Sequence, residues 1–267
     1  MHPLSLRDTI YKSQSLIAYN KGEEPMKTKI WAHRGASGDA PENTLAAFQL
    51  AVDCHADGIE LDVHFTKDRQ VVVTHDDNVE RVTGYKGLVG DLTLVQLKKL
   101  DFSYSMAAFK GETIPTLEEV LALIQPTGLW INIELKTNCE NPNGLEEACQ
   151  KLVESYHMAE RVMYSSFNHL SLYHLREIAP KMSCGILYSN KLHKPWEYAK
   201  SINCTAIHPS FPSLNTPRCM DDCHAVGIQC NTWTVNAQAD IQNMLDLGVD
   251  GIITNYPALA LALRDGK

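Results

Sequence analysis

Charged side chains and a histidine gather at the ends of three short apolar runs in this sequence. The residues concerned are His33, Arg34, Glu60, Asp62, Glu134 and Lys136. Side chains along a β-strand alternate between its two faces, so Glu60 and Asp62 share one face, as do Glu134 and Lys136. If the three runs are neighbouring strands, three carboxylates meet two cations and an imidazole at one edge of the sheet.

Three carboxylates at one place repel one another unless a cation is present. A hard divalent cation bound by oxygen relieves that repulsion, and we expect Mg²⁺ or Ca²⁺, with Mn²⁺ as a further candidate. No cysteine takes part in the pattern, which argues against zinc. The alternative is that the carboxylates form plain ion pairs with Arg34 and Lys136, and the residues alone leave this open.

A second histidine, His75, ends the apolar run VVVT and is followed by Asp76. A metal site with two imidazoles suits acid–base chemistry on a phosphodiester, where one imidazole accepts a proton and the other donates one. Arg34 and Lys136 would then neutralise the phosphoryl oxygens beside the metal. The pattern therefore favours a metal-assisted hydrolase of phosphate esters.

The elements that must position these residues alternate along the chain. Helical stretches between short buried strands imply βαβ units and a parallel sheet. Strands are predicted at 29–33, 58–63, 130–135, 162–166, 184–189, 205–209, 228–235 and 250–255, and helices at 44–54, 145–156, 170–179, 217–226 and 237–248. Eight such strands predict an α/β fold, a closed (β/α)8 TIM barrel with its active site at the C-terminal ends of the strands. A doubly wound open sheet is the alternative.

Two segments do not fit the alternation. Residues 66–116 are too long for one strand–helix unit, and we expect a β-hairpin-like addition and a short helix at 93–100. This predicts a small subdomain, at about 76–116, inserted after the second strand of a barrel domain that spans 27–267. Residues 1–26 form an N-terminal extension with a short helix near 6–19.

Composition narrows the possible partners and compartment. The net charge of −8 argues against non-specific nucleic-acid binding. The N-terminus has no apolar signal-peptide core, and the tail ALALAL at 258–263 is too short to span a membrane, so we expect no integral membrane contact. Eight cysteines without a C-x-x-C motif suit a reducing compartment, so we predict a cytoplasmic protein. Nothing in the sequence indicates an oligomeric state.

One long string resembles a known family. HRGASGDAPENTLAAFQLAVDCHADGIELDVHFTKDRQVVVTHDDNVERVTG is similar to the opening of the glycerophosphodiester phosphodiesterases, in the PLC-like phosphodiesterase superfamily. The similarity continues through IPTLEEVL, INIELK, WTVN and DGIITNYP, and so covers residues 29–257. The combination of HRG, PENT, E-x-D and HD is far more specific than any one of these motifs.

The resemblance implies a TIM barrel with a small insertion and a site for a small glycerophosphodiester. It implies that Glu60, Asp62 and Glu134 hold the metal, that His33 and His75 act as general base and acid, and that Arg34 and Lys136 contact the phosphate. Glu42, the acid of PENT, is expected as a ligand or orienting residue near the metal and glycerol. Trp233, in WTVN, either caps the seventh strand or forms a floor for the glycerol or the alcohol. His208 either shapes a loop or contacts the substrate.

The implied reaction is hydrolysis to glycerol 3-phosphate and an alcohol, with water or the glycerol 2-hydroxyl as nucleophile. One alternative is phospholipase C- or D-like activity on intact lipids, for which the insertion offers the apolar residues Leu88, Val89, Met106 and Phe109. The other alternative is a non-catalytic phosphate-binding barrel, which would lack one of the histidines or carboxylates.

Three positions depart from the family pattern. Arg69 follows Asp68 where the family usually has glycine, Val82 replaces a common threonine, and Asn255 replaces a common aspartate. We expect these departures to affect substrate preference and to leave the metal and acid–base residues untouched.

Overall fold

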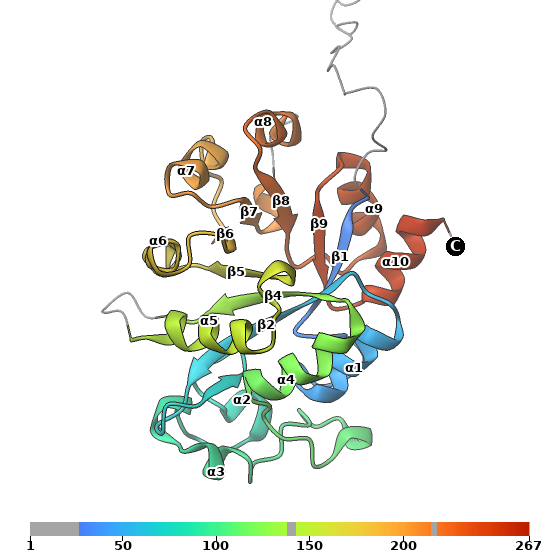
Figure 1. The fold of residues 1–267 in the computed structure, drawn as a ribbon. Helices are drawn as coiled ribbons and strands as arrows, with labels where there is room; N and C mark the ends of the chain where they lie inside the picture. Colours follow the sequence, from blue (N-terminus) through green and yellow to red (C-terminus); the bar gives the residue numbers. More distant parts are fainter. Residues whose placement is uncertain (1–26, 138–142, 215–217, 267) are drawn as a thin grey trace, which may run out of the picture.

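Eight parallel strands close into a barrel in the computed structural model, which describes residues 27–137, 143–214 and 218–266 (Figure 1). The predicted N-terminal extension and its helix at 6–19 lie outside the described residues. Pairing of the first strand with both β2 and β9 closes the barrel, which confirms the predicted TIM-barrel fold. Its strands are β1 (Lys29–His33), β2 (Gly58–Phe65), β4 (Trp130–Leu135), β5 (Val162–Ser166), β6 (Ser183–Tyr188), β7 (Ala206–Pro209), β8 (Gln229–Thr232) and β9 (Gly251–Thr254).

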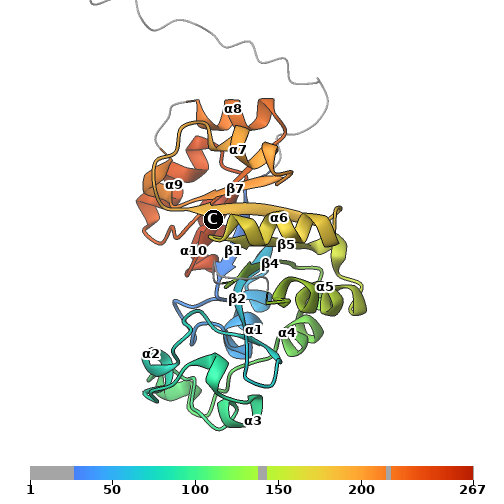
Figure 2. The same ribbon diagram turned by 90° about the vertical axis from the view of Figure 1, so that its left-hand side faces the viewer.

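Helices form the outer layer around the strands (Figures 1 and 2). They are α1 (Leu45–Asp53), α4 (Leu117–Ile124), α5 (Leu145–Ser155), α6 (His169–Ile178), α7 (Pro195–Ser201), α8 (Cys219–Ala225), α9 (Gln238–Leu247) and α10 (Pro257–Asp265). The sequence pattern did not predict α4, α7 or α10. In the described part of the chain, no helix has the length and apolar character needed to cross a membrane.

Side chains alternate between the two faces of each strand, so apolar residues on one face form the core and polar residues on the other form the site. In β2, Ile59, Leu61 and Val63 join the large apolar cluster, whereas Glu60 and Asp62 stand at the alternate positions. Each fully buried Ile or Leu side chain contributes roughly 1.5–3 kcal/mol of hydrophobic stabilisation. The outward-facing residues therefore hold the strands in place while the opposite face remains available for polar groups.

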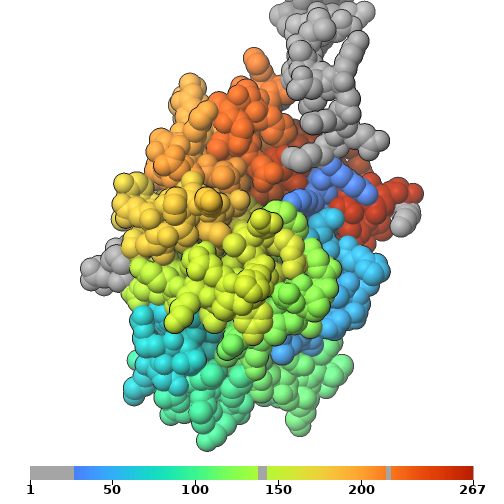
Figure 3. All heavy atoms as spheres, in the orientation of Figure 1, coloured from blue at the N-terminus to red at the C-terminus, as the bar shows by residue number. Residues whose placement is uncertain are grey.

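A smaller apolar cluster stabilises the segment that follows β2. β3 (Val71–Val73) pairs antiparallel with β2, and α2 (Glu80–Thr83) and α3 (Leu94–Leu97) follow it. This segment forms a lobe at one end of the molecule, far from α8 (Figures 2 and 3). The cluster consists of Val72, Val79, Val82, Val89, Leu97, Phe102 and Ile114. The short helix predicted at 93–100 is α3, and the antiparallel pairing agrees with the predicted hairpin-like addition.

Candidate active site

Three carboxylates meet at the C-terminal half of β2 and β4. Asp62 lies opposite Glu134 in the parallel register of the two strands, and Glu60 precedes Asp62 on the same face. One ligand oxygen from each residue lies within 4.8 Å of the others. Glu60, Asp62 and Glu134 are only 4%, 1% and 8% exposed, so water screens their mutual repulsion poorly.

Cations surround this carboxylate cluster. Lys136 Nζ lies 3.0 Å from Asp62 Oδ1 and 2.5 Å from Glu134 Oε1. Arg34 Nε lies 3.5 Å from Asp62 Oδ2, and the Arg34 backbone N–H donates to Glu60 Oε2 at 3.0 Å. The ion pairs that the sequence offered as an alternative to a metal site are therefore present together with the carboxylate cluster.

The carboxylates differ in how well their charge is stabilised. Burial raises the pKa of Glu60 well above its usual value, and the neighbouring charges of Asp62 and Glu134 raise it further. Burial, followed by the charge of Asp62, raises the pKa of Glu134 to about 7. Burial also opposes ionisation of Asp62, but Lys136 and Arg34 outweigh it and lower the pKa of Asp62. The two cations thus stabilise chiefly one of the three charges.

The carboxylate cluster fits a hard divalent cation. Its donors are all oxygen atoms, the class that Mg²⁺ and Ca²⁺ prefer. Among the described residues, Asp62 Oδ1 is a buried atom without a hydrogen bond of good geometry. A cation would also relieve the repulsion that raises the pKa of Glu60 and Glu134. The second oxygen of Asp62 accepts a hydrogen bond from Asn43 Nδ2 at 2.8 Å, which fixes the carboxylate plane.

The loop after β1 brings Arg34 and Asn43 to these carboxylates. Arg34 and Gly35 both have left-handed backbone angles, with φ of 55° and 80°. A Cβ at position 35 would lie 2.6 Å from Ala47, so glycine allows the loop to pack against α1. Thr44 begins α1 as its N-cap, because its side chain accepts a hydrogen bond from Ala47 N. The strings HRG and PENT are thus the turn and the helix start that hold the loop.

His33, the last residue of β1, faces the site with one nitrogen already occupied. Its Nδ1 lies 2.6 Å from Asn255 Oδ1, and its Nε2 lies 4.0 Å from Glu60 Oε2. An amide oxygen can only accept, so Nδ1 carries the proton and Nε2 keeps its lone pair. Burial, with the charge of Arg34, lowers the pKa of His33 to about 4. The expectation that Asn255 leaves the acid–base residues untouched is therefore wrong, because β9 ends beside β1 and brings Asn255 onto His33.

His75 contacts a carboxylate instead of an amide. Its Nδ1 lies 2.6 Å from Asp76 Oδ1, and Arg81 Nε donates to Asp76 Oδ2 at 2.6 Å. Burial opposes ionisation of Asp76, but the hydrogen bonds from Arg81 and His75 outweigh it and lower the pKa of Asp76. Arg81 also donates two hydrogen bonds to Glu42, at 2.8 and 2.7 Å, and Arg34 donates a third at 2.9 Å. Glu42 therefore lies between two guanidinium groups.

A cavity of about 70 Å³ lies among these residues. Its lining includes His33, Arg34, Glu60, His75 and Glu134. Trp233 and Phe167 form an aromatic wall, with ring centroids 5.5 Å apart and planes at 87°. Trp233 lies just beyond β8, which ends at Thr232, and not within the longer strand predicted for 228–235.

His208 lies in β7, inside the barrel, and not in a loop. It is fully buried, and its Nε2 lies 3.0 Å from Asn231 Nδ2. A Cβ on Gly185 would lie 2.4 Å from His208 Nε2, so the imidazole packs directly on that glycine. His208 also accepts a hydrogen bond at its carbonyl from Trp233 Nε1 at 2.7 Å. Its contacts therefore support the aromatic wall from within the barrel.

Comparison with known proteins agrees with this arrangement. The model of the Glycerophosphoryl diester phosphodiesterase family matches residues 33–259. The chain belongs to this family. It is 42% identical over 239 residues to a glycerophosphodiester phosphodiesterase of Caldanaerobacter subterraneus subsp. tengcongensis, covering 89% of this chain and 98% of that protein. A protein of the same name from Bacillus altitudinis is 42% identical over 241 residues, with 89% and 98% covered. As a member of this family, the chain is an enzyme, a phosphoric diester hydrolase.

A solved structure with the same fold contains a reaction product. The Oleispira antarctica phosphodiesterase in complex with the product sn-glycerol-3-phosphate matches with a TM-score of 0.82 and 29% identity. The match covers 90% of this chain and 97% of that chain. The barrel described above is therefore shared over nearly its full length.

The site residues predicted from the sequence lie together around one cavity or on its immediate neighbours. Five further residues, to which no role is assigned above, contact the predicted site residues. Asn43 belongs to PENT and Asp76 to HD, so membership of these motifs was the available signal. Arg81 lies in the four-residue helix α2, and Phe167 follows β5 directly; both segments are too short to show a periodic pattern. The residues not assigned are Asn43, Asp76, Arg81, Phe167 and Asn255.

Proposed function

We propose that the chain hydrolyses glycerophosphodiesters to glycerol 3-phosphate and an alcohol, with a divalent cation held by Glu60, Asp62 and Glu134. The observation that carries this proposal is the buried carboxylate cluster beside a cavity of about 70 Å³, which is lined by two of the carboxylates, Glu60 and Glu134, and by both histidines, His33 and His75. The bound cation would supply Lewis-acid neutralisation of charge on the phosphoryl oxygens. Mg²⁺, Ca²⁺ and Mn²⁺ all suit an all-oxygen donor set.

Arg34 and Lys136 bind the phosphate in this proposal. Both cations lie against Asp62 at the edge of the carboxylate cluster, where they can face a phosphoryl oxygen as well as a carboxylate. Positive groups fixed in advance stabilise the charge that develops in the transition state without reorganising. Glu42 orients Arg34 through their 2.9 Å hydrogen bond.

The aromatic wall and two free polar atoms receive the rest of the substrate. Trp233 and Phe167 offer an apolar surface to carbon atoms of the glycerol or the alcohol. Asn132 Oδ1 and Ser165 Oγ line the same cavity and have no hydrogen-bond partner among the described residues. These atoms suit the hydroxyl groups of a glycerol.

The two histidines divide the proton transfers. We assign the general base to His33, because its amide partner and its burial favour the neutral imidazole with a lone pair on Nε2. We assign the general acid to His75, because the Asp76 carboxylate accepts its Nδ1–H and orients the ring so that Nε2 can donate a proton. One takes the proton of the attacking hydroxyl, and the other protonates the leaving alcohol oxygen.

A coupled assay for glycerol 3-phosphate tests the function. The protein is incubated with a panel of glycerophosphodiesters, with and without chelator. We expect release of glycerol 3-phosphate that stops in chelator and returns when Mg²⁺, Ca²⁺ or Mn²⁺ is added. Full activity in excess chelator would show that the carboxylate cluster does not hold a required metal.

A cavity of about 70 Å³ suits a compact substrate better than an intact lipid. Of the four apolar residues that suggested lipid contact, Val89 is buried, and Leu88 is exposed at 44%. Met106 and Phe109 are half-buried. The assay panel should therefore include one intact phospholipid, which we expect to be a poor substrate.

A further inference from the structure

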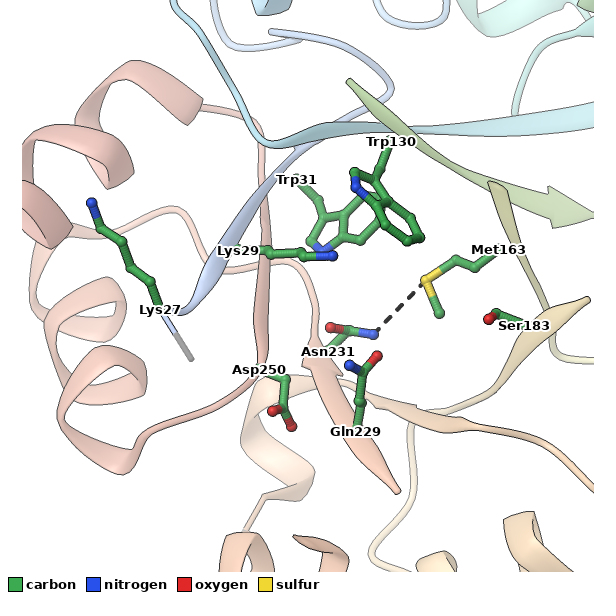
Figure 4. A pocket seen from close by; sticks show the side chains of 9 residues that line it. All are labelled: Lys27, Lys29, Trp31, Trp130, Met163, Ser183, Gln229, Asn231 and Asp250. Atoms are coloured by element: carbon green, nitrogen blue, oxygen red, sulfur yellow. Dashed lines mark hydrogen bonds between the residues drawn. The ribbon is translucent and has the colours of Figure 1, made fainter. Parts of the chain in front are cut away.

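A second cavity lies at the opposite end of the barrel from the candidate active site. It has a volume of about 150 Å³. Four of its lining residues are the first residues of their strands: Lys29 of β1, Trp130 of β4, Ser183 of β6 and Gln229 of β8. This cavity therefore opens where the strands begin, whereas the catalytic residues stand where they end. Figure 4 shows these side chains around a common space.

The indole of Trp31 presents an unused donor to this cavity. Trp31 projects from β1 into the barrel and is only 2% exposed. Among the described residues, its Nε1 has no hydrogen-bond partner. A buried N–H without an acceptor is unfavourable, and nearly all such groups in folded proteins find one. An acceptor bound in the cavity would satisfy it.

Lys29 places a positive charge beside the same space. Its ammonium lies 3.8 Å from the centroid of the Trp130 ring, and the residue is half-buried. Burial lowers the pKa of Lys29, against the opposing charge of Asp57. Asp57 itself pairs with Arg264, and within the described part of the chain no carboxylate lies within ion-pair distance of Lys29 Nζ. The cavity thus contains an ammonium without a close counter-ion.

The other charged residues of the lining already have partners. Lys27 pairs with Asp265 at 2.6 Å. Asp250 accepts a hydrogen bond from Cys230 N at 2.7 Å and lies 3.0 Å from His224 Nε2. The Lys29 ammonium and the Trp31 N–H thus have no ion-pair or hydrogen-bond partner among the described residues, and together they favour an anion.

We propose that this cavity binds a compact oxyanion, a carboxylate or a phosphate group, between the Lys29 ammonium and the Trp31 indole N–H. Trp130 and Met163 provide an apolar wall for the carbon part of such a ligand. The site is distinct from the carboxylate cluster, which repels anions in the absence of a metal. It uses none of the residues placed in the proposed reaction.

Indole N–H signals in a two-dimensional ¹H–¹⁵N NMR spectrum test this proposal. The chain has four tryptophans, so each can be assigned by a single Trp→Phe substitution. Inorganic phosphate and acetate are titrated separately at constant ionic strength. We expect the Trp31 signal to shift along a saturable curve with at least one of them, and the choice between them identifies the ligand class. The Trp233 signal reports separately on the active site.

Two variants and a control determine the role of Lys29. Lys29→Gln should raise the half-saturating concentration about tenfold or more, as expected when a hydrogen bond to a charged group is lost. Lys200→Gln, at an exposed position of α7, should leave it unchanged. Trp31→Phe removes the donor and should weaken the response of the Trp130 signal in the same way, so the test survives if Lys29→Gln does not fold. A linear drift shared by all four indole signals, or an unchanged Trp31 response in Lys29→Gln, would overturn the proposal.

Discussion

Replacing Asp76 with asparagine tests how His75 is prepared for proton transfer. Both carboxylate oxygens of Asp76 are occupied, one by His75 Nδ1 and one by Arg81 Nε, each at 2.6 Å. Arg81 can only donate, so the amide oxygen of Asp76→Asn must stay toward Arg81. The amide NH₂ then faces His75 Nδ1, where it requires an acceptor. The imidazole is forced into the other tautomer, and its protonated form loses an anionic partner.

The expected loss follows from one hydrogen bond to a charged group. Such a bond is worth about 1.5–3 kcal/mol, which corresponds to roughly 10- to 150-fold in kcat. The side chains of His75 and Asp76 are 33% and 30% exposed, and solvent weakens the interaction. We therefore expect the lower part of the range, about 10- to 50-fold. This is less than the roughly 10²–10⁴-fold expected for removing the proton-transfer group itself.

Four proteins measured in one kinetic series decide the result: wild type, Asp76→Asn, His75→Ala and the double variant. Because Asp76 acts through His75, the double variant should be no slower than His75→Ala. Asp77→Asn, at the exposed neighbouring position, is the matched control and should keep the wild-type kcat. The reasoning fails if Asp76→Asn is as active as Asp77→Asn, or if its loss multiplies with that of His75→Ala.

Two further predictions concern the histidines. His33→Ala and His75→Ala should each lower kcat about 10²–10⁴-fold while the metal stays bound. A nitrophenyl ester has a leaving group that needs little protonation, so it should restore the activity of His75→Ala only. If it restores His33→Ala instead, the assigned roles are reversed. Burial lowers the pKa of His208 to about 3, so the unfolded chain binds a proton that the folded chain does not bind between about pH 6.5 and 3. The free energy of unfolding should therefore fall as the pH drops through this window, by up to about 1.4 kcal/mol per pH unit from this group. Denaturant unfolding of His208→Gln should show a shallower slope, and an equal slope would refute the assignment.

The barrel was predictable from the sequence because its strands are short, buried and separated by amphipathic helices. Three helices escaped the pattern for identifiable reasons. α7 has only seven residues and begins at Pro195, and the ALALAL of α10 alternates like a strand. α4 follows a long irregular segment, where its capping box of Thr116 and Glu119 was the available signal. The seventh predicted strand ran too far because apolar character continues beyond Thr232 after the strand ends.

The site was predictable to the extent that strand alternation determines it. The grouping of Glu60, Asp62 and Glu134 could be predicted because side chains alternate along a strand and the two strands were expected to be neighbours. The contact of Asn255 with His33 spans 222 positions and depends on closure of the barrel. Such a contact cannot be predicted from the residues that neighbour either partner in the sequence. The bridge of Arg81 between Asp76 and Glu42 likewise depends on how the segment after β3 folds back over the loop after β1.

The domain boundaries at residue 27 and at about 76–116 stay predictions. The small apolar cluster around Val72 and Leu97 supports a separately packed unit. β3 pairs antiparallel with β2, so backbone hydrogen bonds connect this unit to the barrel without a break.

A ³¹P NMR time course on a glycerophosphodiester tests the central claim most directly. The reaction is run in ¹⁸O-enriched water with Mg²⁺, and a parallel sample contains excess chelator. The account predicts that the diester signal is replaced by that of glycerol 3-phosphate, that the phosphate carries solvent oxygen, and that neither change occurs in chelator. A transient cyclic phosphate signal would identify the glycerol 2-hydroxyl as the nucleophile. An unchanged diester signal in the presence of metal, or equal turnover in chelator, would contradict the account.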